Sequence, residues 1–109
     1  MSQGVAWLLL IVAGLLDVGW AISMKYATGY TRPGWTILSL IFLAAFVYLL
    51  GRVLEVLPVG SAYAVWVGIG AAGTVLFGSV LFGESMSLLR GGGVALIVAG
   101  IVALRFAPA

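Results

Sequence analysis

Long stretches without a charged residue are the feature of this sequence that most limits what the chain can fold into. No residue from Val56 to Gly83 carries a charge, and the stretch from Val5 to Met24 contains only Asp17. A helix needs about 20 predominantly apolar residues to cross the roughly 30 Å hydrocarbon core of a bilayer. Each of these two stretches is therefore long enough for a membrane span.

Two further apolar runs complete the pattern. One extends from Trp35 to Gly51, and the other from Gly91 to Leu104 between Arg90 and Arg105. The last run is short for a crossing, but arginines at both ends can reach the membrane surface and extend it. We predict an all-α membrane protein with one four-helix domain, residues 1–109. Its expected spans are about 5–25, 34–52, 59–82 and 88–106.

Composition excludes most enzymatic chemistry. Hydrophobic residues make up 64% of the chain and charged residues 7%, too few to give a soluble fold its polar surface. Without cysteine or histidine the chain has no thiolate nucleophile, imidazole metal ligand or Ser-His-Asp triad. The basic residues are scattered and form no patch for nucleic acid. We therefore expect neither an enzyme, nor a cofactor, nor a metal site.

The basic residues are almost evenly divided between the two faces of the membrane. Four crossings place both termini on one side, together with Arg52 and Arg105, whereas Lys25, Arg32 and Arg90 lie on the other. Because the excess of Lys and Arg normally fixes orientation, this chain can insert either way. An antiparallel dimer of oppositely inserted copies is then accessible.

Asp17 is the residue most in need of explanation, because a charge within a span costs at least a few kcal/mol. A structural carboxylate, or one hydrated near the interface, is one reading. The other is a binding site: burial in hydrocarbon favours the protonated form and a bound cation favours the charged form, so proton and cation compete. We favour this second reading, which makes Asp17 the substrate and proton site.

Aromatic residues are placed to surround such a carboxylate. Trp20 lies three residues after Asp17 and Gly14 three before, so all three share one helix face. Tyr63 and Trp66 repeat this spacing in the third span. Aromatic rings beside a carboxylate form a box for a cation. The alternative for these rings is core packing or an interfacial belt.

Small residues mark two further features. In the third span we interpret Gly68 and Gly70 as a hinge, with plain close packing as the alternative. In the fourth span, glycines seven residues apart enclose two large aliphatic residues on one face, a pattern suited to helix pairing. The predicted dimer contact consists of Gly93, Leu96, Ile97 and Gly100.

The segments AGLLDVGWAISMKYATGYTR (13–32) and LPVGSAYAVWVGIG (57–70) resemble the small multidrug resistance family. The likeness covers nearly the whole chain. Trp20, LPVG at 57–60, GES at 83–85 and a basic residue at 105 look like its guanidinium-exporter branch. The resemblance implies an antiparallel homodimer in the bacterial inner membrane that exchanges protons for small organic cations.

The resemblance also implies a role for each matching position. Asp17 would bind proton and substrate, Trp20 and Tyr63 would hydrogen-bond beside it, and Trp66 would form a wall of the site. Gly14 would let the first spans of two copies approach each other. The segment from Gly93 to Gly100 would contact its copy in the partner.

Two positions depart from the family pattern. The central acid is usually glutamate, so Asp17 withdraws the carboxylate by roughly 1.5 Å, a displacement large enough to alter coupling or substrate fit. Phe46 stands where the guanidinium branch tends to carry serine. As a lining residue, Phe46 favours a bulkier or more apolar cation.

Several functions therefore remain open. Proton-coupled export of guanidinium or guanidinyl compounds stands first, and export of quaternary ammonium or aromatic cations second. The chain can also be one subunit of a paired heterodimeric transporter, or a structural membrane subunit that transports nothing.

Overall fold

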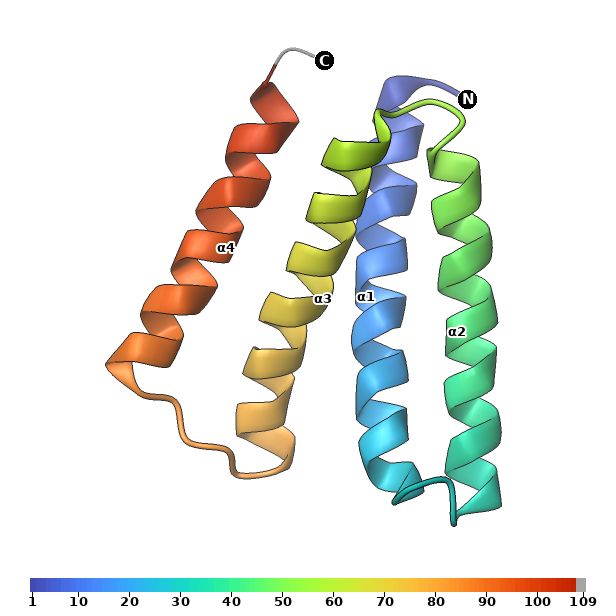
Figure 1. Cartoon of the computed structure of the whole chain (residues 1–109), viewed down its shortest axis with the longest axis vertical. Coiled ribbons are helices and arrows are strands. Elements are labelled where there is room, and N and C mark those ends of the chain that lie inside the picture. Colours follow the sequence, from blue (N-terminus) through green and yellow to red (C-terminus); the bar gives the residue numbers. More distant parts are fainter. Residues whose placement is uncertain (108–109) are drawn as a thin grey trace.

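The computed structural model describes residues 1–107, which form four α-helices running up and down in chain order (Figure 1). These are α1 (Gln3–Ala27), α2 (Pro33–Val53), α3 (Val59–Leu81) and α4 (Leu88–Phe106). All four are long and apolar enough to cross a membrane. The predicted all-α, four-span architecture is confirmed. The last two residues of the predicted 1–109 domain lie outside the described part.

Local sequence explains where the helices begin. Ser2 precedes α1, and its side-chain oxygen accepts a hydrogen bond from the backbone N–H of Val5 at 3.2 Å. Ser87 caps α4 in the same way, with Arg90 as the donor at 3.1 Å. Such caps satisfy N–H groups that have no partner inside the helix. Pro33 occupies the first position of α2, where its fixed φ favours a helix start.

The fourth helix is longer than its uncharged run. It contains 19 residues because it begins at Leu88, before Arg90, and continues past Arg105 to Phe106. The two arginines thus belong to the helix and lie near its two ends. A run that looked short for a crossing is thereby extended to a length that can span the hydrocarbon core.

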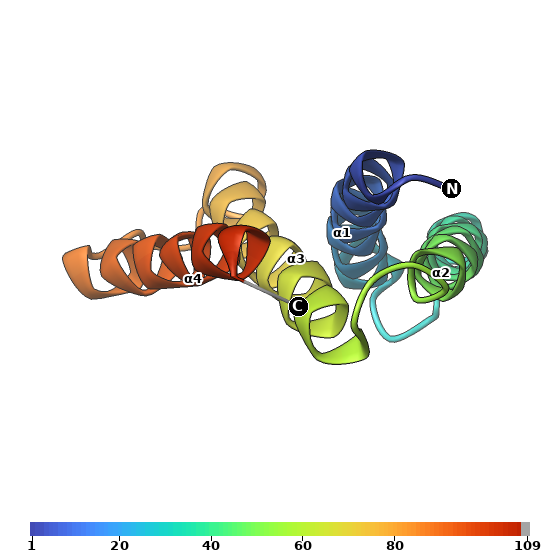
Figure 2. The same cartoon turned by 90° about the horizontal axis from the view of Figure 1, so that it is seen from above.

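The helices do not pack equally. α1 packs against both α2 and α3, whereas α4 packs mainly against α3 and lies on the outside of the group (Figure 2). One cluster of buried hydrophobic residues lies at the end of the molecule that carries the chain termini. It consists of Ala6, Leu10, Val53, Leu57, Ala62 and Val65. None of the residues of α4 is buried.

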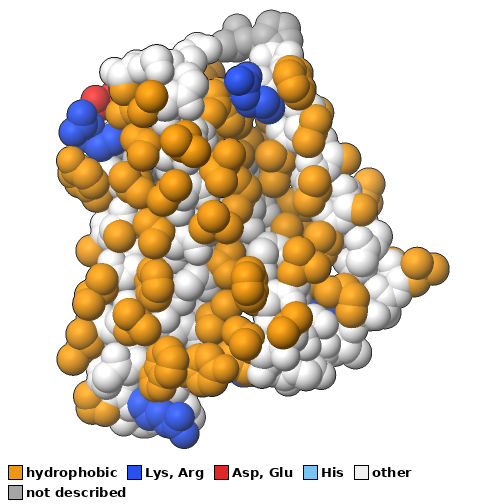
Figure 3. Space-filling view, turned by 180° about the vertical axis from the view of Figure 1, so that it is seen from behind, with side chains coloured by type: hydrophobic (Ala, Val, Ile, Leu, Met, Phe, Trp, Pro, Cys, Tyr) orange, Lys and Arg blue, Asp and Glu red, His pale blue; other side chains and the backbone are white. Residues whose placement is uncertain are grey.

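The outer surface is apolar along the middle of the helices and charged near their ends (Figure 3). Leu88, Leu89 and Val80 expose 95%, 87% and 80% of their surface. Side chains of this kind are costly in water but suit lipid. The chain is a multi-pass membrane protein, with both described ends on one side and the first and third connections on the other (Figure 1).

Candidate functional site

The carboxylate of Asp17 lies against the backbone of Gly70. A Cβ atom added to Gly70 would collide with Asp17 Oδ2, so the carboxylate occupies the space that any larger residue would fill. Asp17 is partly buried, and Gly70 is buried. The ion pairs among the described residues, Arg52–Glu55 and Arg90–Glu84, leave this carboxylate without a basic partner. An acid inside a span with no cation beside it is free to receive one.

Four aromatic residues form a continuous cluster across three helices. Phe46 of α2 lies at its centre, with its ring centroid 5.6 Å from that of Trp20 on α1 and 5.3 Å from that of Trp66 on α3. Tyr63 extends the cluster, with its ring 5.4 Å from Trp66. The structure therefore brings together all four aromatic residues expected to line a cation site.

Helical spacing places this cluster beside Asp17. Trp20 follows Asp17 by three residues on α1, and Trp66 precedes Gly70 by four on α3, so each pair shares a helix face. Since Asp17 and Gly70 touch, both indoles lie within about one helical turn of the carboxylate. A carboxylate close to aromatic rings can hold an organic cation through opposite charge and cation–π attraction.

The cluster also contains a buried donor without a partner. The indole Nε1 of Trp66 is buried and has no hydrogen-bond acceptor among the described residues. Leaving such a donor unpaired costs about 1–3 kcal/mol. Phe46, which is only 3% exposed, has no oxygen to offer it. Phenylalanine at position 46 therefore leaves this part of the cluster without a polar group.

Gly14 contributes to the site by packing within its own chain. A Cβ atom on Gly14 would meet Ile69 Cγ2 at 2.6 Å, so the missing side chain lets α1 and α3 approach closely. Ile69 is adjacent to Gly70, and this contact therefore sets the distance between Asp17 and α3. Contact of Gly14 with a second copy stays a prediction.

The two glycines predicted as a hinge face different neighbours. Gly70 faces Asp17, whereas a Cβ atom on Gly68 would meet Ile101 at 3.1 Å and Ile97 at 3.2 Å, both on α4. α3 continues as an α-helix through both positions. Each glycine has a packing role here, and bending at them stays a prediction.

The predicted dimer face lies largely open. A Cβ atom on Gly93 or Gly100 would meet nothing within 4 Å, and Leu96 is 76% exposed. Ile97 differs from these three, because it packs against Gly68 of the same chain. The open surface of α4 is thus centred on the two glycines and Leu96.

Sequence reasoning missed that Gly70 is the residue opposite the carboxylate. The available signal was its spacing, since Gly70 lies one helical turn after Trp66 and shares its face. Ile69 was missed as well. Its role depends on the vertical register between α1 and α3, which no local pattern encodes.

Comparisons with known proteins agree on one family. The family described as Small Multidrug Resistance protein matches residues 5–97. A guanidinium exporter of Yersinia pseudotuberculosis is 51% identical over 94% of this chain and 98% of its own length. Guanidinium exporters of Escherichia coli K12 and Proteus vulgaris are 43% and 42% identical, covering 92% and 94% of the chain and 95% and 98% of their own lengths. These are names of transporters rather than of enzymes.

Proposed function

The chain belongs to the small multidrug resistance family, and on that premise we propose that it exports guanidinium or guanidinyl cations in exchange for protons. In a bacterium it does so across the inner membrane. The observation that carries this proposal is the placement of the Asp17 carboxylate against Gly70, beside the cluster formed by Trp20, Phe46, Trp66 and Tyr63.

Exchange follows from the use of one carboxylate for two ligands. The protonated acid is neutral and has little attraction for a cation, whereas the ionised acid pairs with one. A cation leaving the site on one side is replaced by a proton arriving there, and the reverse occurs on the other side. Because both ligands need Asp17, they cannot cross together in the same direction.

Substrate identity rests on the relatives and on Phe46. The relatives at 42–51% identity are named guanidinium exporters, and guanidinium is therefore placed first. The buried ring of Phe46 favours a second candidate class, namely hydrophobic quaternary ammonium or aromatic cations.

The working unit in this proposal is an antiparallel homodimer. The near-even division of basic residues allows both orientations. α4 has no buried residue, and the surface around Gly93, Leu96 and Gly100 is open to a second copy. Small residues of this kind let two helices approach closely in lipid. A related paired subunit could take the same place.

The test uses the full-length protein in liposomes with an acidic interior. We expect external guanidinium to enter while internal protons leave, measured in parallel with labelled guanidinium and an enclosed pH dye. Asp17→Asn should abolish both fluxes. Glu55→Gln makes the same chemical change at an exposed carboxylate paired with Arg52, and it should leave both unchanged.

Three results would contradict the proposal. Guanidinium entry without proton exit would show a uniporter, and unchanged fluxes in Asp17→Asn would exclude this residue as the site. Absence of flux for every cation in the wild-type protein, together with a co-purifying membrane partner, would favour a structural subunit instead.

A further inference from the structure

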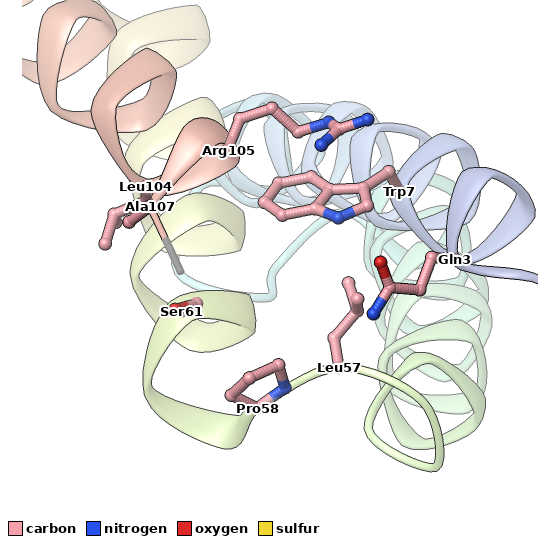
Figure 4. A pocket seen from close by; sticks show the side chains of 8 residues that line it. All are labelled: Gln3, Trp7, Leu57, Pro58, Ser61, Leu104, Arg105 and Ala107. Carbon is pink, nitrogen blue, oxygen red and sulfur yellow. The ribbon is translucent and has the colours of Figure 1, made fainter. Parts of the chain in front are cut away.

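A second pocket lies at the end of the molecule that carries the termini, far along α1 from Asp17. It has a volume of about 190 Å³ and is lined by residues of α1, α3, α4 and the connection between α2 and α3. Arg105 of α4 lies over the indole of Trp7 on α1, with 5.1 Å between Arg105 Cζ and the ring centroid (Figure 4). Gln3 and Ser61 add an amide and a hydroxyl to the lining.

The charge of this pocket suits an anion. Neither ion pair among the described residues involves Arg105, and no acidic residue lines the pocket. The cation–π contact with Trp7 positions the Arg105 guanidinium, and neither ion pair uses its N–H groups. Gln3 and Ser61 lie in the first turns of α1 and α3, where free backbone N–H groups add partial positive charge. An organic cation would be repelled here.

An apolar groove continues from the pocket along the helices. Trp7 and Arg105 line both, and the groove adds only aliphatic and aromatic side chains. These are Ile11, Val65, Ile101, Val102 and Phe106. A positively charged pocket near the ends of the helices therefore borders an apolar groove that extends toward the middle of the spans.

We propose that the pocket and groove together bind one anionic phospholipid. Its headgroup phosphate pairs with Arg105 and accepts hydrogen bonds from Gln3 and Ser61, and one acyl chain lies in the groove. The polar and apolar ends of such a lipid match the two parts of the site in order along the membrane normal. The bound lipid would join α4 to α1, two helices that make few direct contacts, of which Arg105 over Trp7 is one.

The experiment measures tryptophan quenching by brominated lipid chains. Full-length protein is placed in phosphatidylcholine vesicles containing a minor fraction of brominated lipid, either phosphatidylglycerol or phosphatidylcholine. We expect greater quenching by the brominated phosphatidylglycerol, and Trp7→Phe should remove the excess. Arg105→Gln should raise the fraction of brominated phosphatidylglycerol needed for half-maximal quenching by about tenfold or more, because it removes a charged hydrogen-bond donor. Gln3→Ala provides a second, milder variant at an exposed position.

Arg52→Gln is the matched control, since Arg52 lies on the same side of the membrane and pairs with Glu55 outside the pocket. It should keep the excess quenching. Equal quenching by both brominated lipids in the wild-type protein would overturn the proposal. So would an equal loss of the excess quenching in Arg105→Gln and Arg52→Gln. Removal of the excess by inorganic phosphate would assign the site to a free anion. A disulfide between Val102→Cys of one copy and Gly92→Cys, which lies at the matching depth of an oppositely inserted copy, would show a second copy in the groove, which also overturns the proposal.

Discussion

Asp17 on α1 and Gly70 on α3 are in direct contact, and the carboxylate occupies the space where any other residue at position 70 would carry its Cβ atom. The contact ties the acid to the register between the two helices. Gly73, close to one turn further along α3, receives Val18 in the same way, at 2.6 Å from its would-be Cβ. The face of α3 that packs against Asp17 and Val18 therefore needs glycine at both positions, because a larger residue would collide with α1.

Gly70→Ala should therefore impair transport. The added methyl group must displace the carboxylate or separate the helices, and a misplacement of about 1 Å at a reacting group can cost on the order of a hundredfold. Guanidinium-driven proton flux in liposomes is the measurement. Gly60→Ala, also on α3 but with nothing within 4 Å of its would-be Cβ, should transport normally. Normal flux in Gly70→Ala would show that the acid does not work from this position.

The fold was predictable because lipid leaves few alternatives. The part of the uncharged stretch from Val56 to Gly83 that crosses the hydrocarbon must be helical, as α3 is, since a backbone in hydrocarbon has to satisfy its own hydrogen bonds. For the site, the sequence predicted which residues share a face of one helix, but not which residues of different helices meet. The spacing of Asp17 and Trp20 placed them on one face, as did that of Tyr63 and Trp66, whereas the pairing of Asp17 with Gly70 depends on register between helices. Phe46 entered the predicted site through the family resemblance alone, because its place between two indoles depends on how α2 packs against α1 and α3, which no spacing along the chain gives.

Two glycines of α1 should respond oppositely to alanine. Gly14→Ala forces its methyl group against Ile69, and overpacking of this kind costs about 1–3 kcal/mol. Gly4→Ala meets nothing and should be neutral or stabilising by up to about 1 kcal/mol, because glycine weakens a helix. Thermal stability in a mild detergent separates the two. Equal stability of both variants would mean that α1 and α3 are not in close contact at Gly14.

Phe46→Ser should shift substrate preference toward guanidinium. The change removes the ring that packs against Trp20 and Trp66 and introduces a hydroxyl into a cluster whose Trp66 Nε1 has no acceptor among the described residues. Loss of one cation–π partner alone corresponds to about a tenfold change in the preference for a hydrophobic cation over guanidinium. Competition between guanidinium and tetrapropylammonium in the flux assay measures this preference. Phe46→Leu should lose the hydrophobic cation without gaining guanidinium, and an unchanged preference in both variants would remove Phe46 from the site.

Gly100→Leu should weaken dimer formation. Its side chain would fill the open surface beside Leu96 and hold a second helix away, which removes the close packing that drives association in lipid. Single-molecule photobleaching in liposomes at decreasing protein density measures the monomer fraction. Ala95→Leu adds bulk on the opposite side of α4 and should dimerise like the wild type. If both variants dimerise equally well, the interface lies elsewhere.

Cysteine labelling tests dual insertion directly, because the chain has no cysteine of its own. Thr31→Cys places one thiol in the exposed connection between α1 and α2, on the side opposite the termini. With nearly equal basic residues on both faces, an impermeant reagent should label about half of the copies in intact cells. Adding Arg32→Gln lowers the positive charge on that face, so the labelled fraction should rise as more copies place this connection outside. A fraction near zero or one for Thr31→Cys alone would contradict dual insertion, and with it the antiparallel homodimer.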